Sequence, residues 1–167
     1  MADDTTIRTA TLDDGPAVSR LLTACYPALM PTAYKADILA AALPAMTQAN
    51  TRLLECGTYY LAIAGAQVVG CGGWTRERPG SGDTEDKLGH IRHFGTHPDW
   101  TGRGIGSQIY TACERSARLA GISCFECYSS LNAQPFYGAL GFTAVKPHQV
   151  ELGPGVFFST MLMKRCF

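Results

Sequence analysis

The feature that most constrains this chain is a run of three alternating glycines, Gly102, Gly104 and Gly106, placed where a strand meets a helix. His90–Thr96 before them reads as a strand, and residues 104–119 carry apolar side chains at helical spacing. Glycines at such a junction allow positive φ and a close approach to a ligand, while the N–H groups and dipole of the helix start favour an anion. The sequence therefore predicts a phosphate cradle, with a simple tight turn as the alternative.

Two familiar phosphate motifs fit this run poorly. A nucleoside-triphosphate loop ends in Gly-Lys-Ser/Thr, whereas Gly106-Ser107-Gln108 has no lysine. A Rossmann fingerprint needs a glycine at the sixth position, and counted from Gly102 that position is Ser107. A mononucleotide-binding enzyme therefore remains only a minor alternative.

The remaining segments alternate between strand-like and helix-like patterns. Before the glycine run we expect a strand at 7–10, a helix from Asp13 or Asp14 interrupted by Pro27 and Pro31, a helix at 32–45, a hairpin of 59–64 and 67–74, and a mobile loop at 76–87. After the helix, which Gly121 ends, we expect a strand near Phe125, a short helix at 132–140 and strands at 142–145 and 156–163. The order strand, helix, strand predicts parallel strands joined by a crossover helix.

Composition narrows the class of protein further. The chain has 167 residues, of which 46% are hydrophobic, so we expect a single domain over 1–167. With 14 basic and 14 acidic residues the net charge is zero, and we expect no nucleic-acid partner. Because no apolar run approaches the roughly 20 residues of a membrane span and the start is polar, we expect no membrane association and a cytoplasmic protein.

Seven cysteines are scattered singly, and their odd number argues against a disulfide framework. Cys124 and Cys127 form a C-x-x-C pair, but in a strand residues three apart point to opposite faces. We therefore expect buried thiols that act as small hydrophobes, and no metal site.

Two motifs in order resemble the GNAT superfamily of N-acetyltransferases. Thr101-Gly102-Arg103-Gly104-Ile105-Gly106, after His97-Pro98, resembles the family's acetyl-CoA signature, although Thr101 stands where Gln or Arg is usual. Residues 131–142, LNAQPFYGALGF, resemble the family's N-A-x-x-F-Y-x-x-L-G-F element. The resemblance covers about 91–142. It implies a mixed α/β fold with a central, mostly antiparallel twisted sheet of six to seven strands, in which parallel strands four and five splay apart, and about four flanking helices.

The resemblance also implies acetyl-CoA as cofactor and assigns its contacts. The expected cofactor-binding residues are Phe94, Thr96, Thr101, Gly102, Arg103, Gly104, Ile105, Gly106, Ser107, Asn132 and Tyr137. Backbone amides of the glycine run would hold the pyrophosphate, and Phe94 and Thr96 would pair with the pantetheine arm. Tyr137 would be the general acid, since a phenol with a pKa near 10 can protonate a thiolate; packing of its ring is the alternative. Asn132 either caps the short helix or also touches the cofactor arm.

The base and the acceptor are less constrained by the sequence. His90 and His93 are both candidates for the general base, because they lie on the strand expected to carry the acetyl group, and we favour His90. Glu77, Glu85, Glu126 or a water chain are alternatives. A bulge in this strand can change which His faces the cleft. For the acceptor, Tyr26, Tyr34 and Trp74 are candidates for an aromatic wall, although such aromatics more often belong to a core.

The function implied is transfer of an acetyl group from acetyl-CoA to a primary amine of a small molecule or peptide, by direct attack in a ternary complex. A non-catalytic sensor of CoA or acyl-CoA is the alternative. The apolar segment Val156-Phe157-Phe158 also permits a homodimer through the final strands, although core packing explains it equally well.

Overall fold

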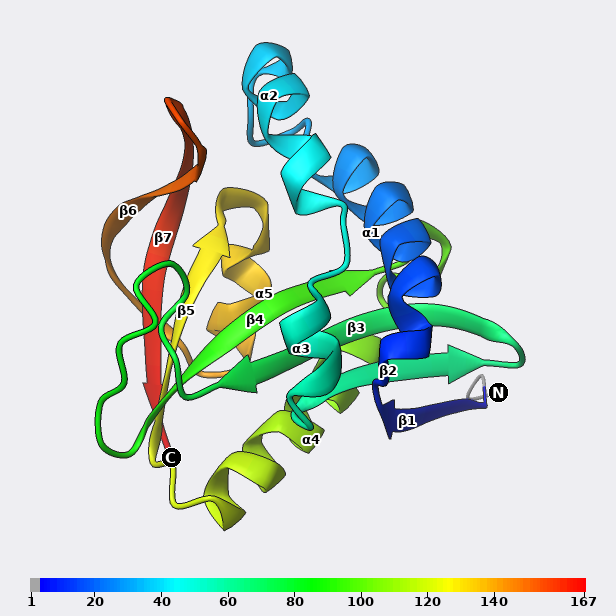
Figure 1. The fold of residues 1–167 in the computed structure, drawn as a ribbon, viewed down its shortest axis with the longest axis vertical. Helices are drawn as coiled ribbons and strands as arrows, with labels where there is room; N and C mark the ends of the chain where they lie inside the picture. Colours follow the sequence, from blue (N-terminus) through cyan, green and yellow to red (C-terminus); the bar gives the residue numbers. More distant parts are fainter. Residues whose placement is uncertain (1–3) are drawn as a thin grey trace.

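A seven-stranded sheet forms the centre of the computed structural model, which describes residues 4–167 (Figure 1). Its strand order is β1-β2-β3-β4-β5-β7-β6. The strands are β1 (Thr5–Thr9), β2 (Tyr59–Ala64), β3 (Gln67–Thr75), β4 (Leu88–Thr96), β5 (Cys124–Ser130), β6 (Thr143–Gly153) and β7 (Val156–Cys166). The first three residues of the polar leader lie outside the described part of the chain.

The sheet is forked between β4 and β5, as expected from the sequence. Every other neighbouring pair is antiparallel, whereas β4 and β5 are parallel and pair only over Leu88–His90 and Cys124–Glu126. Beyond these residues the two strands diverge, as Figure 1 shows. The fork leaves strand edges available to a ligand at the centre of the sheet.

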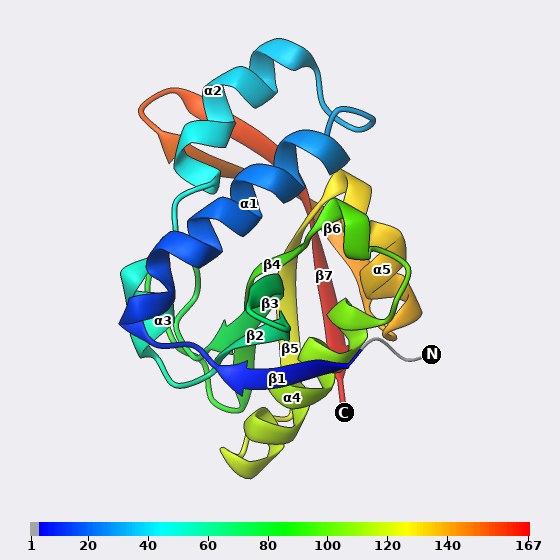
Figure 2. The same ribbon diagram turned by 90° about the vertical axis from the view of Figure 1, so that its right-hand side faces the viewer.

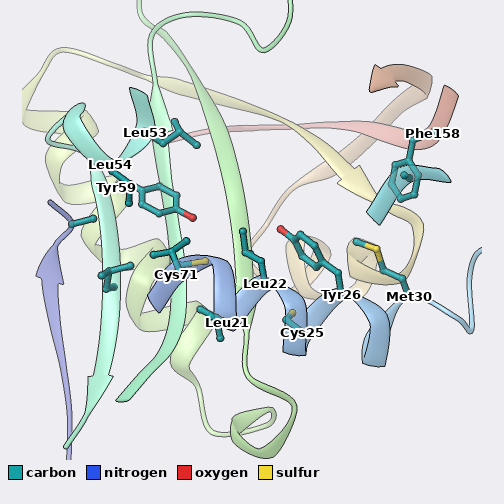
Figure 3. Close-up of a cluster of buried hydrophobic side chains, with 14 of the residues drawn as sticks. Leu21, Leu22, Cys25, Tyr26, Met30, Leu53, Leu54, Tyr59, Cys71 and Phe158 are labelled. Atoms are coloured by element: carbon teal, nitrogen blue, oxygen red, sulfur yellow. The ribbon is translucent and has the colours of Figure 1, made fainter. Parts of the chain in front are cut away.

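Helices cover both faces of the sheet (Figure 2). They are α1 (Gly15–Leu29), α2 (Ala36–Met46), α3 (Thr51–Glu55), α4 (Ile105–Leu119) and α5 (Gln134–Ala139). One buried cluster joins α1, α2 and α3 to the sheet through residues such as Leu22, Leu54 and Leu61 (Figure 3). A second cluster joins α4 and α5 to the sheet through Ile109 and Phe125. Among residues 4–167 no helix is long and apolar enough to cross a membrane.

Several elements differ from the sequence expectation: α2 begins at Ala36 rather than at 32, and β6 runs to Gly153 rather than ending at 145. Pro27 does not interrupt α1, which continues to Leu29. A proline in a helix removes the N–H that would bond the carbonyl four residues earlier, here that of Thr23. Both Pro27 and Thr23 lie on the exposed side of α1, where water can satisfy that carbonyl. The short helix α3 was not expected; the side chain of Asn50 caps it by accepting from the N–H groups of Arg52 and Leu53.

The expectation of free cysteines is wrong for one pair. Cys124 and Cys166 form a disulfide and are direct cross-strand partners of β5 and β7. The pair could not be recognised from spacing because 42 positions separate its members. Cys25, Cys71, Cys113 and Cys127 are buried thiols, as expected, whereas Cys56 is an exposed one.

The charged segment between β3 and β4 is irregular but anchored. Arg78 pairs with Glu85 of the same segment at 2.6 Å and reaches Glu126 of β5 at 3.7 Å. This segment therefore lies over the start of the fork, where Pro79 lines the central cavity.

Candidate active site

One cavity of about 920 Å³ runs through the fork. On one side it is lined by the glycine run, β4, β5 and α5, and on the other by α1, the segment after α2, and the β6–β7 hairpin. Its lining extends from the start of α4 to α1 and the end of α2. We call these two parts the cofactor half and the acceptor half.

The glycine run forms the mouth of the cofactor half. Gly102 and Gly104 have φ of +73° and +78°, conformations that favour glycine, and Gly104 immediately precedes α4. A Cβ on Gly106 would lie 2.8 Å from the ring of Phe136, so α4 and α5 approach each other closely here. The expected cradle is therefore built at the N-terminus of a 15-residue helix.

The side chains of the glycine run are used locally. Thr101 donates from its hydroxyl to the carbonyl of Pro98 at 3.1 Å, and the Arg103 guanidinium lies 4.6 Å above the Trp100 ring. Ile105 is buried in the core beneath. Thr101, Gly102, Gly104, Ile105, Gly106 and Ser107 line the cavity, and Arg103 does not.

A bulge in β4 faces the fork. Arg92 pairs with Gly73 and Gly95 with Cys71, so His93 and Phe94 together oppose Gly72, and His93 has a φ of +43°. A Cβ on Gly72 would lie 2.6 Å from the Phe94 ring, which explains a glycine opposite the bulge. Phe94 and Thr96, both expected to contact the cofactor, line the cavity.

Two buried tyrosines fix the carbonyls of this bulge from opposite sides. Tyr59 donates to the carbonyl of His93 at 2.9 Å, and Tyr26 donates to that of Phe94 at 3.1 Å. Figure 3 shows both hydroxyls directed toward β4. Burial raises the pKa of each well above 10, so both remain donors. The peptide groups around Phe94 are thereby held in one orientation at the fork.

Tyr137 of α5 lies on the other side of the fork. Its ring packs edge-on against Phe94 and Phe142, and its phenol interacts electrostatically with the thiol of Cys127 on β5. Burial raises the pKa of Tyr137 well above 10 and that of Cys127 to about 12. The expected acid thus lines the cavity with its proton retained, and its hydroxyl is not in bulk water.

Asn132 does not cap the short helix, contrary to one of its two expected roles. The N-cap position of α5 is Ala133, because a 3₁₀ turn over Leu131–Ala133 precedes the helix. The side-chain Oδ1 of Asn132 is buried without a hydrogen-bond partner and lines the cavity. A buried, unpartnered acceptor costs about 1–3 kcal/mol, so this position favours a ligand that donates a hydrogen bond.

The two histidines of β4 lie in different places. His90, the favoured base, is buried and borders a separate small void with Glu126, whose Oε2 lies 4.0 Å from His90 Nδ1. His93 lines the large cavity. Burial, with the charges of Arg78 and Arg92 on His90 and of Arg92 on His93, lowers the pKa of each to about 4. Both are therefore neutral near pH 7, and the geometry places His93, not His90, beside the fork.

The aromatic wall expected from Tyr26, Tyr34 and Trp74 is not formed. Only Tyr26 lines the cavity. Tyr34 is buried, donates to the carbonyl of Ser159 at 2.7 Å and accepts from the N–H of Leu131 at 2.8 Å. Trp74 packs on the α4 side of the sheet and donates to the hydroxyl of Ser116. Both are structural residues.

The acceptor half is built from residues that the sequence did not single out. Its apolar lining comes from α1, α2 and the β6–β7 hairpin: Leu29, Met30, Met46, Val150, Leu152 and Phe158. Arg92 of β4 is the residue with a charged side chain among the described residues that line the whole cavity. From the sequence alone, these apolar residues cannot be told apart from ordinary core residues. They line one cavity because the fold brings the β6–β7 hairpin next to α1 and α2.

A sheet forked between two parallel strands, with a glycine cradle at the mouth and a buried tyrosine inside, defines an acyltransferase. Residues 33–164 match the acetyltransferase (GNAT) domain family. The chain belongs to the GNAT acetyltransferase family. No match is found among curated protein sequences.

Solved structures share the fold at low sequence identity. A GNAT-type N-acetyltransferase from Rhodopseudomonas palustris superposes with a TM-score of 0.83 at 19% identity, covering 100% of this chain and 98% of the other. PaiA N-acetyltransferase from Thermoplasma acidophilum, solved with coenzyme A, gives 0.75 at 13% identity, covering 98% and 99%. A GNAT acetyltransferase from Staphylococcus aureus Mu50 gives 0.69 at 14%, also covering 98% and 99%. At these identities the likeness establishes the fold alone.

Proposed function

We propose that this protein transfers an acetyl group from acetyl-CoA to a primary amine of a small molecule or peptide, by direct attack in a ternary complex within one domain, residues 1–167. The observation that carries the proposal is the single cavity that connects the glycine cradle at Gly104 with Tyr137 and then with a separate acceptor half. Such a cavity allows donor and acceptor to be bound together, which direct transfer requires.

The residues present fit coenzyme A. Backbone N–H groups from Gly102 to Ser107 would hold its pyrophosphate at the start of α4. Phe94 and Thr96 would pair with the extended pantetheine arm along the free edge of β4. The unpartnered Oδ1 of Asn132 offers an acceptor to an amide N–H of that arm. When bound, the cofactor supplies the acetyl thioester.

Tyr137 is proposed to return a proton to the departing sulfur. A phenol whose pKa is raised well above 10 is a weak acid in water, but burial raises the pKa of a thiol in the same place as well. The Cys127 thiol beside it shows this, because burial raises its pKa as well. Burial therefore shifts the pKa of the proposed acid and that of a thiol at this place in the same direction, which keeps proton transfer between them feasible.

The backbone N–H near Phe94 is proposed to polarise the acetyl carbonyl, because the bulge turns this peptide group away from regular pairing. For the base we propose His93 ahead of His90, since His93 lines the cavity. A neutral imidazole has a lone pair to accept the amine proton. The mostly apolar acceptor half favours a neutral, nucleophilic amine.

The proposal is tested by release of free thiol from acetyl-CoA in the presence of an amine panel, with thermal unfolding to measure cofactor binding separately. Acetyl-CoA at about 100 times its Kd should raise the unfolding free energy by roughly 2.7 kcal/mol. Stabilisation with thiol release supports the transferase. Stabilisation without release by any amine supports the sensor instead, and ATP competing with acetyl-CoA supports a mononucleotide enzyme.

A homodimer through β6 and β7 is part of the proposal. Val145 and Phe157 are 55% and 54% exposed on these strands, and β6 is an edge strand of the sheet. If light scattering finds a monomer, the homodimer is excluded and the proposed acetyl transfer is unaffected.

A further inference from the structure

Arg92 is a charged residue without a charged partner at the central cavity. It lies on β4, is half-buried, and its Nη1 donates to the hydroxyl of Thr75 at 3.0 Å. Within residues 4–167, no Asp or Glu oxygen lies within 4.0 Å of its guanidinium. By contrast, other arginines such as Arg8, Arg78, Arg118 and Arg165 form ion pairs.

The surroundings of Arg92 do not compensate its charge. None of the described residues that line the cavity is Asp, Glu or Lys. Burial lowers the pKa of Arg92, against the opposing effects of Cys56, Glu77 and Tyr59. A desolvated guanidinium is costly unless a hydrogen-bonding anion meets it, and a carboxylate fits its planar fork of donors.

The position of Arg92 relates it to the proposed transfer site. It precedes the two bulge residues His93 and Phe94 on the same strand, and all three line the cavity. The lining of the same cavity also includes apolar side chains such as Met30, Met46 and Leu152.

We propose that Arg92 binds a carboxylate of the acceptor, so that the amine acetylated here belongs to an amino acid, or to a similar carboxylate-bearing amine, with an apolar side chain. This inference rests on the proposed function and names its substrate class. A site of this kind binds polyamines and other polycations poorly, because they would place positive charge against Arg92. A purely structural role, as a brace for Thr75, is the competing explanation.

The test compares matched acceptors that differ in the carboxylate. Leucine, leucinamide and 3-methylbutylamine share a side chain, and kcat/KM for each is measured by thiol release. We expect leucine to exceed 3-methylbutylamine at least about tenfold, since hydrogen bonds to a charged group contribute about 1.5–3 kcal/mol. Arg92→Gln should lower kcat/KM for leucine by about 10- to 100-fold and leave that for 3-methylbutylamine within about twofold. Arg92→Lys should retain part of the preference, and Kd for acetyl-CoA should not change.

The structural explanation has its own control. Thr75→Val removes the hydroxyl that Arg92 contacts but keeps the guanidinium. If Arg92 acts on a carboxylate, Thr75→Val keeps the preference for leucine. If Arg92 is only a brace, Arg92→Gln and Thr75→Val lower kcat/KM for both acceptors together, and the proposal is overturned.

A binding measurement separates failure of this inference from failure of the proposed function. Calorimetry with 4-methylpentanoate, the carboxylate without an amine, needs no turnover. Binding by the native protein that is lost in Arg92→Gln supports the carboxylate site even if no amine is acetylated, in which case the transferase proposal fails alone. Equal turnover of 3-methylbutylamine and leucine, with no binding of 4-methylpentanoate, overturns the carboxylate site and leaves the transferase intact.

Discussion

The phenol of Tyr137 lies close enough to the thiol of Cys127 for each to shift the pKa of the other, beside the fork where β4 and β5 separate. The two residues come from α5 and β5 and both line the central cavity. A phenol and a thiol therefore lie side by side at the fork. A departing thiolate at the same place would find the donor already oriented.

Replacing Tyr137 with Phe tests this relationship. The ring packing against Phe94 and Phe142 is kept, so we expect the Kd of acetyl-CoA to stay within about twofold, while kcat falls by about 10²–10⁴, the usual contribution of a general acid. Tyr110→Phe, which removes a buried hydroxyl outside the cavity lining, is the matched control and should keep kcat. Unchanged kcat in Tyr137→Phe removes Tyr137 from the mechanism.

Replacing Gly104 with Ala tests the cradle against a matched glycine. Gly104 and Gly121 have φ of +78° and +81°, and neither has a heavy atom within 4 Å of an added Cβ. Both substitutions should lower the unfolding free energy by about 1–2 kcal/mol through left-handed backbone strain. Only Gly104 borders the cavity, so only Gly104→Ala should weaken acetyl-CoA binding in calorimetry. Equal loss of affinity in both variants would mean that general destabilisation, not the cradle, is responsible.

Asn132 should show opposite effects on stability and on binding. Because its Oδ1 has no partner, Asn132→Ala should leave the unfolding free energy unchanged or slightly raised. The Kd of acetyl-CoA should rise about 2- to 10-fold, the contribution of one hydrogen bond. Asn50→Ala provides the contrast: it removes the cap of α3 and should cost about 1 kcal/mol. A large loss of stability in Asn132→Ala would show that its amide has a structural role.

Local patterns predicted the parts of the site that depend on neighbours in sequence. The glycine cradle, the helix after it and the hairpin at 59–74 each follow from spacing within about fifteen residues, and the structure has them. Tyr137 lines the cavity because α5 follows β5 after a turn, which the motif at 131–142 already implied.

Parts that depend on register or on distant pairing could not be read from the sequence. The bulge at His93 decides that His93, and not His90, borders the large cavity, and a one-residue irregularity leaves no clear mark in the sequence. Aromatic residues such as Trp74 and Tyr34 occur both in ligand-binding walls and in hydrophobic cores. Only their hydrogen bonds in the folded protein identify these two as core residues. The isolation of Arg92 is likewise a property of the folded arrangement.

The disulfide missed in the sequence gives a stability prediction. Cys124 and Cys166 close a loop with a sequence separation of 42, which corresponds to about 2–4 kcal/mol of stabilisation. Urea unfolding with and without a phosphine reductant should differ by that amount, and Cys124→Ser with Cys166→Ser should abolish the difference. Cys56→Ser, which changes an exposed free thiol, is the control and should leave the difference between the two unfolding measurements unchanged. Thiol titration of the unreduced, denatured protein should find 7 − 2 = 5 free thiols; seven would mean that the bond does not form.

His90 makes the fold sensitive to acid. Its pKa is lowered from 6.5 to about 4 by burial and by the charges of Arg78 and Arg92, which outweigh the opposite effects of Glu85 and Glu77. Between these two pH values the unfolded chain binds more protons than the folded one, so stability falls as pH decreases from about 6.5 to 4 and then levels for this group. The loss from His90 is at most about 3 kcal/mol.

Urea unfolding at intervals from pH 8 to pH 4 measures this loss, and His90→Gln should reduce the slope because glutamine does not titrate. His93, whose pKa is also lowered to about 4, contributes with the same sign, so the double variant with His93→Gln should be flatter still. Asp14, held by Arg8 with a pKa of about 2, responds only below this range, since the carboxylate loses its stabilising charge as pH falls from about 4 toward 2. A slope between pH 6.5 and 4 that is the same in wild type and His90→Gln would mean that His90 is already accessible to protons in the native fold.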